Sequence, residues 1–213
     1  MKDLLTVLPM AFVMVAGPQI VAAIVLATST NARRDSSFFL LGAGAATTIG
    51  VTAAYFLTGL LKKGSSDFHA DPGLMRGIDI AIVAVLLLLA WKVFHDRARA
   101  QTPRWMTKLE TATPVDALKV GVLLFLLFPG NLLSMGTVGA YLAHHDAAWW
   151  HTLVFVAATV LLAGIPLLLL LLLGRRAQTL LPEIRNWMTA NSWIVSEILI
   201  AFFLAMTLKN LAG

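Results

Sequence analysis

The chain of 213 residues is 59% hydrophobic and only 13% charged, and its mean hydropathy is +0.82. This composition excludes an ordinary soluble domain, because the apolar residues form blocks of about 20, the length that crosses a hydrocarbon core of about 30 Å. The net charge of +5 does not indicate nucleic-acid binding, since the basic residues lie at the ends of these blocks, where they set topology and meet anionic headgroups.

Six apolar blocks predict six transmembrane helices, at about residues 4–28, 37–61, 75–94, 115–142, 149–173 and 188–208. Short polar loops separate the blocks, so we expect a single transmembrane domain over residues 1–213. It divides into a first repeat at about 4–94, a cytoplasmic loop at about 95–114 and a second repeat at about 115–210.

The first and fourth blocks are interrupted at corresponding places. A proline inside a helix removes one hydrogen bond and displaces the carbonyl four residues earlier, and in lipid such backbone survives only where protein or a wet cavity covers it. Each interruption also carries an amide side chain. Paired breaks of this kind predict a substrate pathway at mid-depth, bordered by Gly17, Pro18, Gln19, Pro129, Gly130 and Asn131. The alternative is that both prolines are packing kinks without a ligand.

A unit of three spans that is repeated once must insert its second copy upside down. The sequence therefore predicts an all-α membrane protein of six transmembrane helices, built as two inverted three-helix repeats with broken first and fourth helices. Eleven of the 16 lysines and arginines lie on the face of the first, third and fifth connections, and five lie on the other face. The positive-inside rule makes the eleven-charge face cytoplasmic and places both termini outside a cytoplasmic (plasma) membrane.

Helix two carries small residues at intervals of four, at Gly42, Ala46 and Gly50. Small residues on one stripe let helices approach closely, so we expect this stripe to pack against another helix.

Two acids lie inside the predicted spans. Glu197 is near the centre of helix six, where an acid must be neutral, paired or hydrated, and it is the first candidate for proton coupling. Asp79, in helix three, is the second candidate, although Arg76 three residues earlier favours a structural ion pair. The alternative for Glu197 is a neutral acid that bonds across a helix interface.

The outer loop "AHHDAAWWH" contains His144, His145, Asp146 and His151, which have the donor types of a metal site. No histidine within a span would carry a metal onward, and the tryptophans indicate an interfacial belt. The absence of cysteine excludes thiol redox chemistry and any thiolate metal site. We expect neither a metal site nor a cofactor.

Four stretches resemble the peptidoglycolipid-addressing (GAP, or Sap-like) proteins. They are "LPMAFVMVAGPQIVAAIVLATSTNARRDSSFFLLGAG", "GIDIAIVAVLLLLAWKVF", "ALKVGVLLFLLFPGNLL" and "LLPEIRNWMTANSW". The resemblance spans essentially the whole chain and includes Gly17, Pro18, Pro129 and Asn131 as motif positions. It implies membership of the lysine-exporter superfamily, a three-plus-three helix plan and a role in moving glycolipids or their precursors to the cell surface.

We therefore expect a secondary transporter, not an enzyme, that exports or flips an amphiphilic cargo: a glycolipid, a phospholipid or a polyprenyl-linked precursor. Its partners would be membrane lipids and this cargo, and the sequence leaves open a homo-oligomer or a complex for lipid synthesis or export. One alternative is an exporter of small solutes such as amino acids on the same scaffold. Another is an accessory protein of a lipid export complex that transports nothing itself.

Overall fold

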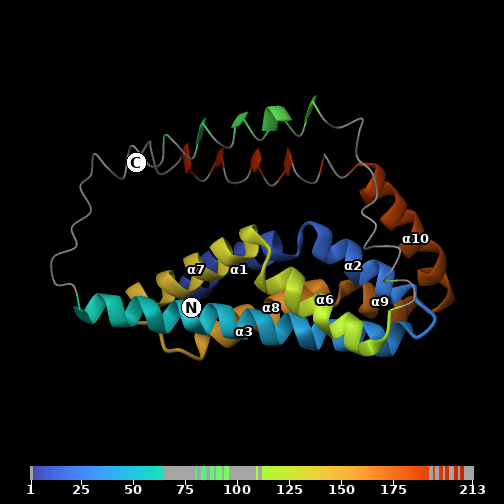
Figure 1. Ribbon diagram of the computed structural model, residues 1–213, viewed down its shortest axis with the longest axis horizontal. Coiled ribbons are helices and arrows are strands. Elements are labelled where there is room, and N and C mark those ends of the chain that lie inside the picture. Colours follow the sequence, from blue (N-terminus) through green and yellow to red (C-terminus); the bar gives the residue numbers. More distant parts are fainter. Residues whose placement is uncertain are drawn as a thin grey trace. The chain divides into compact units, whose positions relative to one another are not determined.

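The structure, a computed structural model, describes residues 2–64 and 112–191 without a gap. It also describes residues 80, 83–84, 87–88, 90–92, 94–95, 109, 194, 197–198, 200–201, 204–205 and 207–208. Within this part of the chain every regular element is a helix and none is a strand, which confirms the predicted all-α class (Figure 1). The chain forms two compact units, Met1–Gly64 with Pro103–Trp187, and Ser65–Thr102 with Met188–Gly213.

The first predicted span is broken where the sequence places the break. Helix α1 covers Lys2–Val15 and helix α2 covers Pro18–Ala27, and their axes differ by 61°. Gly17 joins them with φ +147°, a conformation that side chains disfavour, and Pro18 begins α2 because its missing N–H costs nothing at a first helical position. The second span is one continuous helix, α3, over Ala32–Gly64.

The fourth predicted span is broken in the same way. Helix α6 covers Pro114–Leu126 and α7 covers Pro129–His144, with a bend of 64° between them. Thr113 and Asp116 form a reciprocal capping box at the start of α6, which satisfies its first backbone donors and fixes where it begins.

The fifth predicted span also bends, by 52°, between α8 over His151–Ala163 and α9 over Ile165–Leu173. It is followed by a helix, α10 over Arg175–Ala190, where the sequence analysis expected a connecting loop. Pro182 lies inside α10, and Ala177 and Leu181 are its buried residues, so most of this helix is exposed.

By length and composition, one helix of the described residues, Ala32–Lys62, is apolar enough to cross a membrane, and counting each bent pair as a single span raises the number to four. In the second unit, the described positions between 80 and 95 and between 194 and 208 are helical; all but position 95 fall within the third and sixth predicted spans. These apolar helices are consistent with a membrane protein.

Helix α3 runs parallel to the broken helix α6–α7. Near its start, Gly42 lies against Leu118 of α6, and near its end Lys62 forms an ion pair with Asp146, just after α7 (Nζ–Oδ1 3.0 Å). Residue numbers therefore rise along both helices in the same direction. The two ends of α3 define two poles of the first unit. Helices α2 and α9 both end at the pole where α3 begins, since the residues after α2 line one cavity together with Leu170 and Gly174.

Two glycines allow α3 and α6 to cross at close range. A Cβ atom on Gly42 would overlap the carbonyl oxygen of Leu118, and a Cβ atom on Gly121 would overlap that of Phe39. Beside this crossing, the buried rings of Phe39 and Phe125 meet edge to face with centroids 6.1 Å apart. The two backbones touch at the crossing, so these two positions have no room for a side chain.

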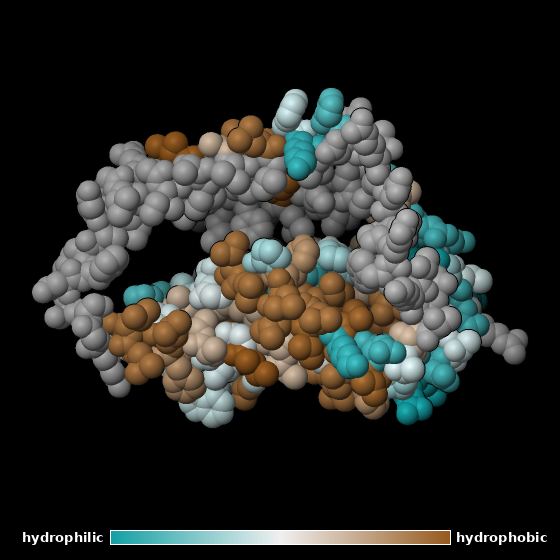
Figure 2. All heavy atoms as spheres, viewed as in Figure 1, coloured by the Kyte–Doolittle hydropathy of each residue, from teal (hydrophilic) through white to brown (hydrophobic). Residues whose placement is uncertain are grey.

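Many large apolar side chains point outward from this first unit. Leu172 of α9 is 81% exposed and Leu133 of α7 is 71% exposed. In Figure 2 brown apolar spheres cover much of the visible face of the unit that holds α3 and α6, and teal hydrophilic spheres gather toward α10. An apolar exterior of this extent is what a lipid-facing surface requires.

We predict that Gly42→Ala lowers the melting temperature of the detergent-solubilised protein, because the added methyl group must push two backbones apart, at a cost of about 1–3 kcal/mol. Gly59→Ala is the matched control in the same helix, since no atom lies within 4 Å of the Cβ position there. It should be neutral or slightly stabilising. Equal effects of the two substitutions would show that the crossing is not close-packed.

Candidate functional site

The two broken helices meet at one backbone carbonyl, that of Leu124 in α6. The side-chain amide of Asn131 donates to the Leu124 oxygen with Nδ2–O 3.1 Å, and the amide of Gln19 donates to the same oxygen with Nε2–O 3.4 Å. The second bond is long and therefore the weaker. Both side chains are deeply buried, Gln19 at 1% and Asn131 at 2% exposure. We call this group of three residues the amide junction.

The Leu124 oxygen needs these donors because α6 ends here. The last four carbonyls of a helix have no partner within it. Leu127 N–H still bonds the carbonyl of Leu123, but no bond from Phe128 N–H to Leu124 follows, because the chain leaves the helix at Leu127 (φ −99°, ψ −11°) and is extended at Phe128 (φ −71°, ψ 123°). The expected effect of Pro129 was on Phe125, four residues earlier; the bend at Phe128 frees the preceding carbonyl as well.

The Gln19 carbonyl oxygen is buried and has no hydrogen-bond partner among the described residues. It lies beside the break, since a Cβ atom on Gly17 would be 2.9 Å from it. The amide cannot be reversed without loss, because its nitrogen is the group that bonds Leu124. The junction therefore presents one unoccupied acceptor.

Helices α2 and α7 both begin at the junction, with Pro18 and Pro129 at their first positions, and neither has a side-chain cap. The start of α6, in contrast, has a complete capping box. Uncapped N-termini leave backbone donors and a partial positive charge of about half a unit each. Gly130, in the first turn of α7, is only partly buried, and its carbonyl accepts from Ser134 Oγ at 2.9 Å.

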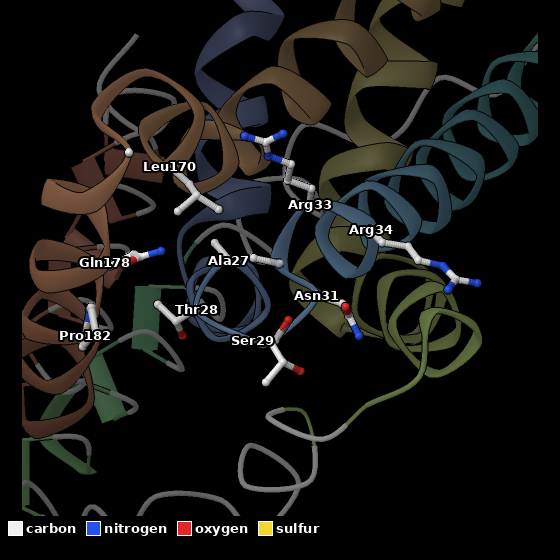
Figure 3. A pocket seen from close by; sticks show the side chains of 12 residues that line it. Ala27, Thr28, Ser29, Asn31, Arg33, Arg34, Leu170, Gln178 and Pro182 are labelled. Atoms are coloured by element: carbon white, nitrogen blue, oxygen red, sulfur yellow. The ribbon is translucent and has the colours of Figure 1, made fainter.

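A polar cavity of about 790 Å³ lies at the pole where α2 ends and α3 begins. Its lining consists of residues 27–34 on one side and Leu170, Gly174, Gln178 and Pro182 of the α9–α10 segment on the other (Figure 3). We call it the polar-loop cavity. In Figure 3 the Arg33 guanidinium lies on the side of Leu170, whereas Arg34 extends away from α9 and α10.

Asp35 lies next to this lining and is only 2% exposed. Its Oδ2 atom accepts a hydrogen bond from Ser29 Oγ at 2.7 Å, while its Oδ1 atom and the Ser36 hydroxyl have no partner among the described residues. Because Ser29 uses its proton on Asp35, the lone pairs of its oxygen remain for other donors.

The opposite pole of α3 holds a second cavity, of about 570 Å³, lined in part by Tyr55, Lys62 and Asp146. Tyr55 of α3 donates to the carbonyl of Ala147 at 2.7 Å, and this bond holds the loop between α7 and α8 against α3. His145 Nδ1 lies 2.9 Å from the carbonyl oxygen of Tyr141 in α7, and His151 Nδ1 lies 2.9 Å from the carbonyl oxygen of Ala148. Within the described part of the chain no group of three or more metal-ligating side chains occurs.

The remaining predicted site residues lie apart from the amide junction in the sequence. Glu197 belongs to the second unit, where it is partly buried and its Oε1 atom has no hydrogen-bond partner among the described residues. Asp79 lies outside the described residues. On α3, Gly42 faces α6, Ala46 is buried and Gly50 faces the thioether of Met135 on α7.

Three features escaped the sequence analysis: the Leu124 carbonyl, the buried Asp35 and the polar-loop cavity. The sequence carries a signal for the last, because four polar residues, Thr28–Asn31, are separated only by Ala32 from two arginines.

Comparison with known families gives one match: the family model described as Sap, sulfolipid-1-addressing protein, covers residues 7–210. This confirms the Sap-like resemblance seen in the sequence. No curated protein and no solved structure matches the chain.

We predict that the two amides of the junction are energetically coupled. Gln19→Met or Asn131→Leu alone leaves the Leu124 oxygen one donor and should lower the free energy of unfolding by about 1 kcal/mol. The double variant leaves a buried carbonyl unpaired and should lower it by about 1–3 kcal/mol beyond the sum of the single variants. Unfolding of all four proteins in detergent, followed by circular dichroism, gives this coupling.

The control cycle pairs Asn131→Leu with Thr113→Ala, the cap of α6, which is about 16 Å of helix away from Leu124. That pair should be additive. A Gln19/Asn131 double variant that costs no more than the sum of the single ones would show that the shared carbonyl does not join the two broken helices.

Proposed function

Because the chain belongs to the Sap, or sulfolipid-1-addressing protein, family, we propose that it exports or flips an amphiphilic cargo across the cytoplasmic membrane. The cargo would be a glycolipid, a phospholipid or a polyprenyl-linked precursor. The observation that carries this proposal is the family match, which spans nearly the whole chain. Kinship with the lysine-exporter superfamily, and action as a secondary transporter rather than an enzyme, are parts of the same proposal.

The packing of the first unit supports two inverted repeats. If the halves are superposed, α1 corresponds to α6, α2 to α7, and α3 to α8–α9. The contact between α3 and α6 then corresponds to the contact between α1 and α8. The contact between α3 and α7 corresponds to that between α2 and α9, and the contact between α1 and α7 corresponds to that between α2 and α6. The bends of 61° and 64° are also nearly equal. In this scheme the first unit contains the first two spans of each repeat, and the second unit contains the third span of each repeat.

The direction of the helices supports a six-span path. Helices α3 and α6–α7 run parallel, so the chain between Gly64 and Pro114 must return from one pole of α3 to the other. Over a helix of 33 residues that distance is about 50 Å, and one further span provides the return. Helix six would complete the second repeat and place both termini on the outer side.

The amide junction supports a transport pathway at mid-depth. Helix α2 has 10 residues between the break and its end, or about 15 Å, half of a hydrocarbon core. There the unpaired Gln19 oxygen and the two uncapped helix starts offer an acceptor and donors to a cargo hydroxyl or to water. Discontinuous helices place such groups at the substrate sites of many secondary transporters.

The test of this function is lipid movement in vesicles. We expect purified protein in phosphatidylcholine vesicles to speed the crossing of a fluorescent phospholipid or glycolipid, followed by quenching of the outer leaflet, and an imposed proton gradient to increase the rate. Glu197→Gln should keep the fold and the basal crossing but lose the response to the gradient, because an amide cannot exchange a proton.

An unchanged gradient response in Glu197→Gln would remove this residue from coupling without touching lipid movement. If the vesicles instead release a labelled amino acid and leave lipids in place, the protein is a small-solute exporter. Movement of neither cargo would favour an accessory role in a lipid-synthesis or export complex.

The predicted topology can be tested directly because the chain contains no cysteine. Thr30 and Ala148 are exposed at opposite poles of the first unit. We expect an impermeant maleimide to label Ala148→Cys in intact cells and Thr30→Cys only after the membrane is permeabilised, as the positive-inside rule requires. The reverse labelling pattern would invert the proposed orientation.

A further inference from the structure

We propose that the polar-loop cavity binds the headgroup of an anionic phospholipid, a phosphate ester that also bears hydroxyl groups, before the lipid crosses the membrane. This inference rests on the proposed function for its place in transport, but the binding itself is separate from transport. The cavity lies apart in sequence from the amide junction, and its about 790 Å³ is enough for a lipid headgroup.

The charge of the cavity favours an anion. Arg33 and Arg34 belong to the lining, and none of the described residues forms a salt bridge with either guanidinium. Asp35, which follows them in the sequence, is buried; its carboxylate holds the hydroxyl of the lining residue Ser29 and forms no salt bridge with either guanidinium. A guanidinium without a protein partner can bind a phosphate ester through two parallel N–H bonds, because its planar fork matches the spacing of two phosphate oxygens.

The rest of the lining suits a headgroup with hydroxyls. Thr30 and Asn31 are exposed beside the arginines, and Gln178 of α10 faces them from the other side, so both sides of the cavity carry amide or hydroxyl groups (Figure 3). The Ser29 oxygen retains lone pairs that can accept from a cargo hydroxyl, because its proton is donated to Asp35.

The position of the cavity favours a lipid over a free ion. The side opposite the arginines begins with Leu170 near the end of α9, a helix whose neighbouring side chain Leu172 is 81% exposed. The same side continues along α10, which buries Ala177 and Leu181 and exposes polar residues along with Leu180 and Ile184. Such a helix lies in the headgroup layer, so a lipid bound here would keep its tails on the apolar surface of α9.

The test is equilibrium binding in detergent, measured by calorimetry with three probes: dioctanoyl phosphatidylglycerol, dioctanoyl phosphatidylcholine and inorganic phosphate. We expect the wild-type protein to bind the phosphatidylglycerol more tightly than either of the other two. Arg33→Gln should weaken that binding by about tenfold, the effect of losing a charged hydrogen bond. Gln178→Leu, on the opposite wall, should weaken it by a smaller factor.

Lys119→Gln is the matched control, because it removes the same charge from an exposed position on α6 that does not line the cavity. It should leave binding unchanged. Arg33 and Gln178 are both exposed, so their variants should keep the wild-type circular dichroism spectrum.

Unchanged phosphatidylglycerol binding in Arg33→Gln, or an equal loss in Lys119→Gln, would overturn the proposed site. Inorganic phosphate that binds as tightly as the lipid would overturn the lipid assignment. Failure of lipid movement in vesicles, with Arg33-dependent binding intact, would instead disprove the transport function and leave the binding site standing.

Discussion

A backbone carbonyl that loses its helical partner inside an apolar bundle must find another donor, and the Leu124 oxygen in this protein finds two. An unpaired buried carbonyl costs about 1–3 kcal/mol, a large part of the stability of most proteins. Asn131 satisfies it from the other side of the same break, and Gln19 reaches it from the break in the first span. One oxygen thus ties together segments that are 105 residues apart. The paired breaks, otherwise a liability for both helices, become a point of tertiary contact.

The crossing of α3 and α6 explains how the second helix and the fourth come to lie so close. Gly42 and Gly121 each face the backbone of the other helix, so neither position tolerates a methyl group without movement. Helix α3 is unbroken over 33 residues, while its neighbour bends by 64° immediately beyond the crossing. The glycine contact fixes one half of the broken helix to a straight support. The α7 half is held separately, by Gly139, on which a Cβ atom would lie only 2.8 Å from the Val51 carbonyl oxygen, and by the ion pair of Lys62.

The sequence predicts what depends on local chemistry. Pro18 and Pro129 cannot continue a helix, and Gly17 supplies the conformation that the first break needs, so both breaks could be placed to within two residues. The partner of the two amides could not be predicted, because the carbonyl that is freed depends on where Phe128 turns. Helix α10 was expected as a loop because this connection between two predicted spans is too polar to form an apolar block. Asp35 reads as one more polar residue beside two arginines, and only the fold buries it.

The two sites differ in how they would treat a charged headgroup, and this difference bears on export. At the polar-loop cavity Arg33 provides a full positive charge near water. At the amide junction the side chains, Gln19 and Asn131, are neutral. If the cargo is anionic, the only fixed positive potential that the junction itself offers comes from the starts of α2 and α7, about half a charge each. Partial charges of this size lower the cost of bringing an anion to mid-depth without forming a full ion pair there, which would be hard to break in a medium of low dielectric constant. The headgroup would thus bind strongly at the entrance and weakly at the centre of the membrane. Weak binding at the centre allows the headgroup to leave that site and complete the crossing.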